Sequence, residues 1–188
     1  MRNKNLLPII IVLFSMLFIS CNNSDKFKIA KGKVGYLTQK TTVGELENLF
    51  KKDSIIKNLS EGSLGDNYFQ DDDEYLIYEK GGKHLLTIIP KEQLDSTSTI
   101  KSIQIFDDRF KTENGTTIKS TFAEIELNNT VNKVETSFSS ATLFLDDLNA
   151  TMTIDKEELG IKGYNTQKVS LGQIPDLAKI KSFIIWFN

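Results

Sequence analysis

The chain has 188 residues, of which 39% are hydrophobic and 26% are charged, and its formal net charge is −2. This composition excludes a disordered chain, a collagen-like chain and a multi-span membrane protein. The single Cys excludes an internal disulfide, and one His without a second thiol is too little for the common zinc sites or a Cys–His catalytic pair. We therefore expect no metal and no cofactor.

The amino-terminal segment has the organisation of an export signal. Arg2 and Lys4 precede an almost unbroken apolar run from 6 to 19, and Cys21 follows shortly after. The run is shorter than the roughly 20 residues that a helix needs to cross a bilayer. We therefore favour a signal peptide over residues 1–20 rather than a retained transmembrane segment.

The residues that end at Cys21 read LFISC, and they resemble the lipobox of bacterial lipoproteins. The resemblance implies that Cys21 carries a diacylglycerol thioether, that cleavage occurs before it, and that the new amino terminus is acylated, for example with palmitate. Lipidation also explains an unpaired Cys in an exported chain. Asn22, by resemblance to the proteobacterial sorting rule, permits transfer to an outer membrane. The predicted location is the cell envelope, with the lipoprotein anchored in the outer membrane.

The mature chain, residues 21–188, has 21 basic and 25 acidic residues. This balance argues against a nucleic-acid partner, which requires a clustered basic face. We expect residues 21–30 to be a polar tether. The length of the mature chain suits one ordinary domain, residues 31–188, made of two repeats at about 31–110 and 111–188.

An internal duplication is predicted from segments that match in the same order along the chain. The matching pairs are 42–46 with 121–125, 89–94 with 154–159, and 100–106 with 180–186. The first pair has the Thr-x-x-Glu form of a helix capping box, so we expect a short helix to start after Thr42 and after Thr121. Val43, Leu46, Leu49 and Phe50 would form the core-facing side of the first helix.

Apolar alternating stretches predict the strands. The glycines in the segment 80–83 favour a tight hairpin between strands at 74–79 and 84–89. The remaining expected strands are a second hairpin at 142–145 and 150–154, closing strands at 100–106 and 181–187, and preceding strands such as 34–37 or 116–119. The run 183–187 is apolar on both faces, which predicts a central strand covered on each side. The expected fold class is α+β, predominantly antiparallel, with two duplicated helix–hairpin–strand units about a pseudo-twofold axis.

The offsets between matching segments change, which predicts an extra loop in each unit, at 60–73 and at 160–179. The first loop holds the candidate partner or ligand residues Tyr68, Phe69, Asp71, Asp72 and Asp73. Its acidic run could bind Ca²⁺ through oxygen, but it lacks the ligand spacing and the turn glycine of an EF-hand, so a solvated loop is the simpler interpretation. Packing of the two aromatic residues on the sheet is likewise simpler than an exposed contact.

Other chemistry-bearing residues do not form a recognisable catalytic set. His84 starts a strand without a Ser or Cys partner nearby in sequence, so we interpret it as structural. The acidic pairs 107–108 and 146–147 could supply an acid and a base, yet such residues at turns usually bond to backbone. The segment 80–83 matches no phosphate-binding loop. We predict no catalytic residue and no enzymatic activity.

A family resemblance rests on two stretches. KVGYLT at 33–38 leads to TVGEL at 42–46, and TENGT at 112–116 leads to TFAEI at 121–125. These stretches look like segments of uncharacterised envelope lipoproteins of the Bacteroidota, with a remoter likeness to the RpoE-regulated lipoproteins. The likeness implies a strand-rich α/β prism and an envelope location, and it implies no active-site residue.

Two functional hypotheses follow. The first is a non-catalytic, lipid-anchored envelope protein that binds or scaffolds another envelope component. The alternative is a ligand-binding or inhibitor-type lipoprotein that uses the loops 60–73 and 160–179. A hydrolase with paired carboxylates at Asp107 and Asp147 ranks third. The expected partners are the membrane, through the lipid, and an envelope protein.

Overall fold

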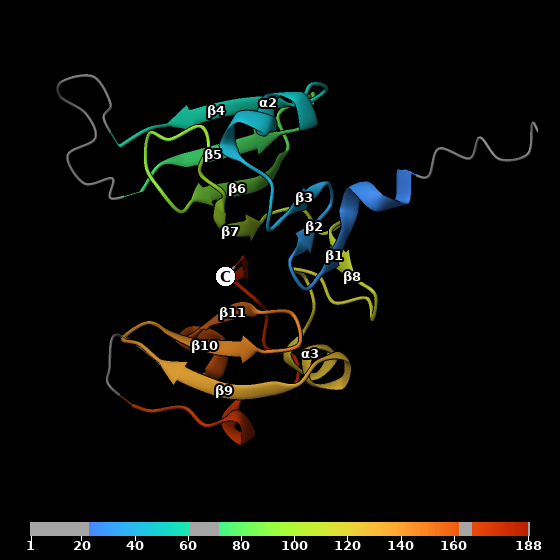
Figure 1. Cartoon of the computed structure of the whole chain (residues 1–188). Coiled ribbons are helices and arrows are strands. Elements are labelled where there is room, and N and C mark those ends of the chain that lie inside the picture. Colours follow the sequence, from blue (N-terminus) through green and yellow to red (C-terminus); the bar gives the residue numbers. More distant parts are fainter. Residues whose placement is uncertain (1–22, 61–71, 162–166, 188) are drawn as a thin grey trace, which may run out of the picture.

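The computed structural model describes residues 23–60, 72–161 and 167–187 (Figure 1). Its largest element is an antiparallel sheet of eight strands in the order β4-β5-β6-β7-β12-β11-β10-β9. The strands are β4 (Ser54–Asn58), β5 (Glu74–Tyr78), β6 (His84–Pro90), β7 (Ile100–Ile105), β9 (Val131–Thr136), β10 (Ser140–Leu145), β11 (Ala150–Asp155) and β12 (Ser182–Trp186). Each half of the sheet therefore contains four strands, and β7 pairs with β12 at the centre.

A second, smaller sheet lies beside the centre of the large one, at the side where the chain enters (Figure 1). Its order is β3-β2-β1-β8, with β1 and β8 parallel and the other pairs antiparallel. These strands are β1 (Lys28–Ala30), β2 (Lys33–Val34), β3 (Leu37–Thr38) and β8 (Lys111–Thr112). The small sheet thus joins the amino-terminal segment to the chain that follows β7.

The helical elements are short. Within the described residues, the α-helices are α2 (Leu46–Leu49) and α3 (Phe122–Asn128), and the 3₁₀ turns are η2 (Asn23–Phe27), η3 (Val43–Glu45), η4 (Lys156–Leu159) and η5 (Leu171–Gln173). Both predicted capping boxes are present, because the Glu45 and Glu124 carboxylates accept hydrogen bonds from the amides of Thr42 (2.8 Å) and Thr121 (2.9 Å).

The predicted α+β class with two duplicated helix–hairpin–strand units is wrong. The described chain is mostly antiparallel β, and its helices span only four and seven residues. A capping box stabilises the start of a helix and does not determine its length. In this chain each short helix is followed by a strand that the sequence analysis missed. The internal duplication itself stays a prediction.

The missed strands, β4 and β9, are the two edges of the large sheet. Both carry charged and exposed side chains, such as Lys57 on β4 and Lys133 and Glu135 on β9. Charged edge strands protect a sheet from pairing with other chains, and these two contain fewer apolar residues than an inner strand such as β5, which makes them harder to recognise from sequence. By contrast, both predicted hairpins are confirmed as β5–β6 and β10–β11.

The buried hydrophobic residues form one cluster that includes side chains from both halves of the large sheet. At its centre Phe183 lies opposite Ile105, and Ile185 lies opposite Ile103, and all four side chains are at most 1% exposed. The predicted central position of the carboxyl-terminal strand is confirmed. Its second face, with Trp186, is only half-buried, so the strand is fully covered on one face alone.

We expect Phe183→Ala to lower the free energy of unfolding by about 3–5 kcal/mol, because it removes a fully buried aromatic ring and leaves a cavity in the centre of the core. Urea denaturation measures this change. Leu177→Ala is the matched control, since Leu177 is 78% exposed and its removal should change stability by about 0.5 kcal/mol or less. Equal effects of the two substitutions would contradict the assigned core.

Candidate functional site

A buried ion pair lies where the chain leaves β7. The Asp107 side chain is 0% exposed, and its carboxylate accepts hydrogen bonds from the backbone amide of Arg109 (2.9 Å) and from the guanidinium Nη2 of Arg109 (2.6 Å). The ammonium of Lys83, from the β5–β6 turn, lies 3.0 Å from the same carboxylate. One carboxylate therefore has two cationic partners.

The charges of this cluster hold each other in the ionised state. Burial alone would favour protonated Asp107, but the hydrogen bonds from Arg109 and Lys83 hold the pKa of this carboxyl well below its usual range. The carboxylates of Asp107 and Glu79 raise the pKa of Arg109. Glu79 completes the cluster with two parallel hydrogen bonds from the guanidinium, of 3.0 and 2.8 Å.

The same guanidinium holds the amino-terminal segment of the domain. Its central carbon lies 4.4 Å from the centre of the Phe27 ring, and that ring also makes an edge contact with Phe110 at 5.0 Å. One residue earlier, Lys26 forms an ion pair of 3.2 Å with Asp53, whose side chain is 7% exposed. The described part of the expected tether, residues 23–30, is therefore folded against the domain as η2 and β1.

Gly35 is needed for this arrangement. Its amide donates to the carbonyl of Lys28 at 2.8 Å, its φ is +57°, and a Cβ at this position would lie 2.4 Å from the carbonyl oxygen of Lys26. Any other residue would push the amino-terminal segment away from the β2–β3 turn.

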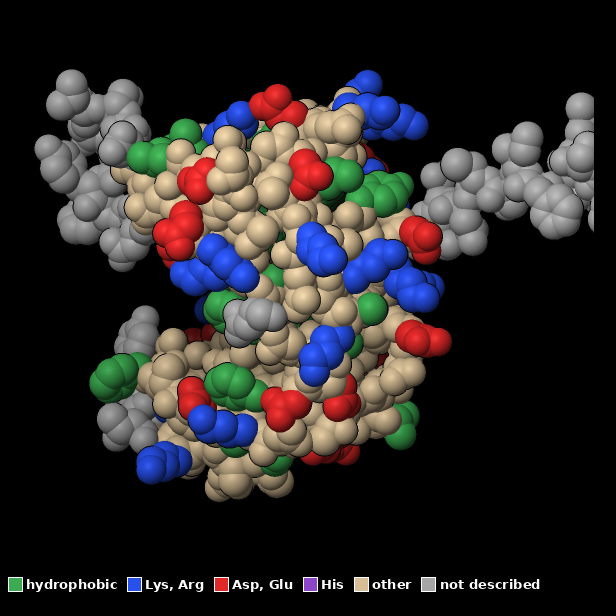
Figure 2. Space-filling model, viewed as in Figure 1, with side chains coloured by type: hydrophobic (Ala, Val, Ile, Leu, Met, Phe, Trp, Pro, Cys, Tyr) green, Lys and Arg blue, Asp and Glu red, His purple; other side chains and the backbone are tan. Residues whose placement is uncertain are grey.

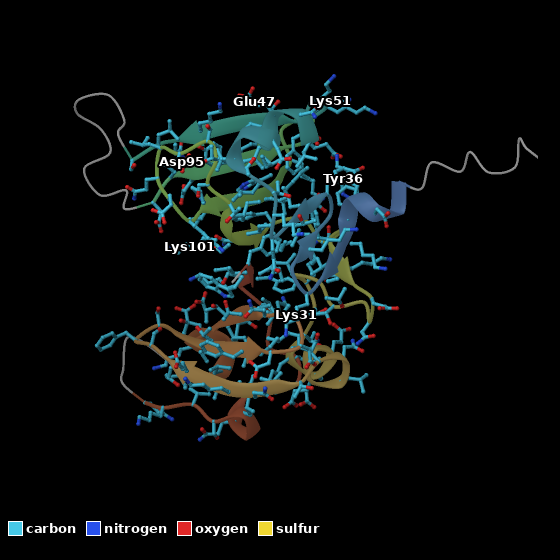
Figure 3. The ribbon with its side chains drawn as sticks, viewed as in Figure 1. Lys31, Tyr36, Glu47, Lys51, Asp95 and Lys101 are labelled. Atoms are coloured by element: carbon cyan, nitrogen blue, oxygen red, sulfur yellow. The ribbon has the colours of Figure 1, made fainter. Side chains whose placement is uncertain are left out.

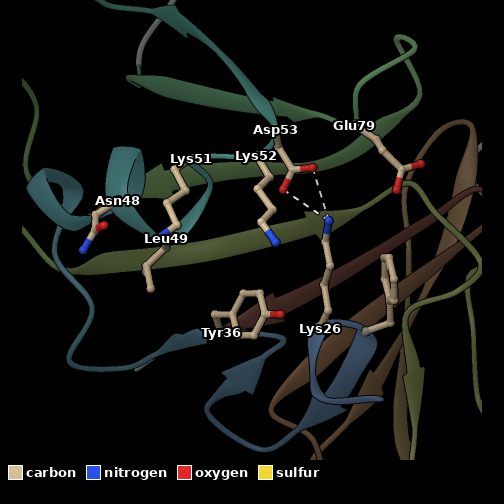
Figure 4. Close-up of a pocket in the computed structure, with 9 residues that line it drawn as sticks. Lys26, Tyr36, Asn48, Leu49, Lys51, Lys52, Asp53 and Glu79 are labelled. Carbon is tan, nitrogen blue, oxygen red and sulfur yellow. Dashed lines mark hydrogen bonds and ion pairs between the residues drawn. The ribbon is translucent and has the colours of Figure 1, made fainter. Parts of the chain in front are cut away.

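A pocket of about 610 Å³ lies between this segment and the turn that follows α2 (Figure 4). Its lining residues are Lys26, Phe27, Tyr36, Asn48, Leu49, Lys51, Lys52, Asp53 and Glu79. Asp53 and Glu79 are neutralised by their ion pairs with Lys26 and Arg109. Lys51 and Lys52 are exposed, and neither has an ion-pair partner within the described ranges.

A second pocket, of about 350 Å³, adjoins the ends of the predicted loop 60–73. Its lining is mostly apolar and includes Leu46, Ile55, Leu59, Tyr75 and Leu94, with Glu47 and Lys57 paired at 2.7 Å at its rim. The loop's last candidate residue, Asp73, is 1% exposed and accepts hydrogen bonds from the Ser60 amide (2.9 Å) and the Leu94 amide (2.7 Å).

These hydrogen bonds fasten the two ends of the loop together. Burial favours protonated Asp73, but the amides of Leu94 and Ser60 outweigh it and hold the pKa of the carboxyl below its usual value. Asp72 is half-exposed and lies 3.3 Å from Lys101. The other predicted residues, Cys21, Tyr68, Phe69 and Asp71, lie outside the described residues.

The remaining predicted residues do not come together. His84 is stacked between Tyr78 (4.6 Å) and Phe106 (3.9 Å), and burial lowers its pKa. Asp147 is exposed and accepts a hydrogen bond from the Thr130 amide at 2.9 Å, whereas Asp107 is enclosed in its ion pairs. No group of three or more His, Cys, Asp or Glu able to hold a metal occurs among the described residues.

Sequence reasoning missed the pocket beside the amino-terminal segment. One signal was available. Residues 25–53 contain seven Lys and four acidic residues, whereas residues 54–188 contain 14 basic and 21 acidic residues. Overall net charge conceals this asymmetry between the two parts of the chain.

Comparisons with known proteins identify the fold. No family model and no curated protein matches the chain. Among solved structures, the uncharacterized protein yfeY from Escherichia coli is similar, with a TM-score of 0.50 and 14% sequence identity over 85% of this chain and 99% of the other. At this identity the likeness concerns the fold alone.

Within the described residues, no helix has the length and apolar character needed to cross a membrane.

We expect Asp107→Asn to lower the free energy of unfolding at pH 7 by about 3 kcal/mol, because it leaves Arg109 and Lys83 without their buried partner. The folded pKa is depressed, so the stabilisation is present above the unfolded pKa of about 3.9 and is lost as pH falls below it. Urea titrations at several pH values should therefore show the two proteins converging in acid.

The neighbouring Asp108→Asn is the control for this prediction. Asp108 is 38% exposed and pairs with Lys119 at 3.1 Å, and such a surface pair contributes about 1 kcal/mol or less. If the two substitutions destabilise equally, or if the Asp107→Asn difference is as large at about pH 2 as at pH 7, the buried ion pair does not have the stabilising role assigned to it.

Proposed function

We propose that the protein is a non-catalytic lipoprotein of the cell envelope, anchored through Cys21 in the outer membrane, which binds or scaffolds another envelope component. The observation that carries this proposal is the fixed position of residues 23–30. The chain follows an export signal and the lipobox-like Cys21, and from Lys26 onward it is held by an ion pair and aromatic contacts.

Cys21 precedes Lys26 by only five residues, which limits the distance between the lipid and the folded domain. Five residues span at most about 17 Å even when fully extended. A lipid at Cys21 therefore keeps the pocket side of the domain close to the bilayer surface. Residues 26–30, which follow the attachment point, are held against the domain by an ion pair and aromatic contacts, which suits a protein that presents a defined surface to its neighbours.

The absence of catalysis is part of the proposal. The carboxylate of Asp107, whose pKa is lowered most strongly, forms ion pairs with Lys83 and Arg109, and the single His is stacked between two aromatic rings. The resemblance to Bacteroidota envelope lipoproteins and to the RpoE-regulated lipoproteins supports the envelope location. The fold shared with yfeY agrees with that resemblance in architecture.

A second candidate function is ligand binding or enzyme inhibition by the loop 60–73. The pocket of about 350 Å³ at the ends of this loop favours it, because an apolar cavity beside a long connection is a common place for a ligand. The loop 160–179 shares this role in the alternative, and Val169 and Ile174 hold its described part in the core.

The lipid anchor is tested by mass spectrometry of the protein extracted with detergent from its native membrane. We expect a chain that begins at Cys21 and carries the added mass of a diacylglycerol and an acyl chain, and we expect Cys21→Ser to lack this mass and to leave the membrane fraction. An unmodified Cys21 in a soluble mature chain would contradict the anchor.

The second candidate is tested by photo-crosslinking in intact cells through a benzophenone amino acid at position 56, where Ile56 is 51% exposed at the sheet edge near this loop. Removal of residues 61–71 retains Ser60 and Asp73, whose hydrogen bond holds the ends together. The loop hypothesis predicts that this deletion abolishes the crosslinks. It is refuted if they persist, and a probe at the distant, exposed Leu177 serves as the control.

A further inference from the structure

We propose that the basic face around the 610 Å³ pocket docks on anionic phospholipid headgroups of the membrane to which the chain is attached. This inference rests on the proposed membrane attachment, and it adds an orientation of the domain and the residues that produce it. The pocket residues Lys51 and Lys52 are the central contacts.

The charge distribution distinguishes this face from the rest of the protein. The part of the chain from 25 to 53 has an excess of three basic residues, whereas residues 54–188 have an excess of seven acidic ones. Lysine side chains gather over the small sheet, on the side where the chain enters (Figure 2). An anionic surface would therefore attract this side and repel most of the others.

The pocket itself has two lysines available for a ligand. Lys52 projects into it from the turn after α2, toward the Lys26–Asp53 ion pair (Figure 4). Since Asp53 and Glu79 are already neutralised, Lys51 and Lys52 give the pocket its net positive charge. Two ammonium groups on one wall suit the phosphate of a lipid headgroup.

Apolar side chains next to these lysines are placed to contact the acyl chains that lie below the lipid phosphates. Tyr36 is 44% exposed at the rim, and Leu49 lines the same pocket. Tyr36 lies next to the amino-terminal segment and Lys51 lies on the same side of the molecule, near α2, whereas Lys101 lies at the opposite side (Figure 3). Tyrosine is enriched at membrane interfaces, where its ring contacts acyl chains and its hydroxyl remains hydrated.

The position of the anchor makes a membrane the favoured occupant. Phe27 and Lys26 line the pocket, and Cys21 is only a few residues before them. Attachment within about 17 Å places Lys51 and Lys52 near the surface, where each basic residue strengthens binding by about fivefold. A free phosphate, unlike the membrane, would not be brought close to the pocket by the lipid at Cys21.

The test uses the full-length protein reconstituted in vesicles of phosphatidylglycerol and, separately, of phosphatidylcholine. Reductive methylation followed by mass spectrometry gives the labelling rate of each lysine. We expect Lys51 and Lys52 to react at least about fivefold more slowly on the anionic vesicles. The exposed Lys168 and Lys179, in the other half, should change by less than about twofold, and about 1 M salt should remove the difference.

Single substitutions make the test specific. In Lys51→Gln the protection of Lys52 should fall by about fivefold, and the reverse holds for Lys52→Gln, whereas Lys168→Gln, with the same change in net charge, should leave both protected. Membrane-bound protein with equal labelling of all four lysines would overturn the docking and leave the anchor intact. Protein that associates with neither vesicle would overturn the proposed attachment, and the docking with it.

Discussion

The pairing of β7 with β12 is the constraint on which the rest of the structure depends. β12 lies between β7 and β11, so the backbone pairing of the large sheet passes from one half to the other through this strand. Its buried residues Phe183 and Ile185 face residues of both neighbouring strands, and they belong to the single core cluster. Without β12, two sheet edges with apolar faces would be open to solvent, a condition that favours aggregation.

The same central strand positions the site. β7 continues directly into Asp107, whose buried charge holds Arg109, and Arg109 in turn contacts Phe27. The amino-terminal segment is thus fixed through a short series of contacts that begins at the centre of the sheet. The pocket with Lys51 and Lys52 is lined by Lys26 and Phe27 of this segment, so its position relative to these two residues follows from the fold. The membrane orientation we propose is a consequence of that connection.

Short sequence patterns correctly predicted the hairpins and the helix starts, which depend on residues close together in the chain. Gly81 and Gly82, both at positive φ, marked the first hairpin, and Thr-x-x-Glu marked both helix starts. The predicted fold class was wrong because the length of a helix and the formation of an edge strand depend on tertiary contacts. The local sequences of β4 and β9, with their charged residues, do not indicate that these segments pair with the sheet. The ion-pair cluster could not be predicted from local sequence. Asp107 and Lys83, and likewise Glu79 and Arg109, come within ion-pair distance only because β5, β6 and β7 are paired.

Native-state hydrogen exchange of the intact protein tests the role of β12 most directly. If β12 joins the two halves into one cooperative unit, the slowest amides of β5 and β6 and those of β10 and β11 should open with the same free energy and respond alike to low urea. A lower opening free energy for β10 and β11, with β5 and β6 still protected, would show that one half unfolds alone and would contradict the account.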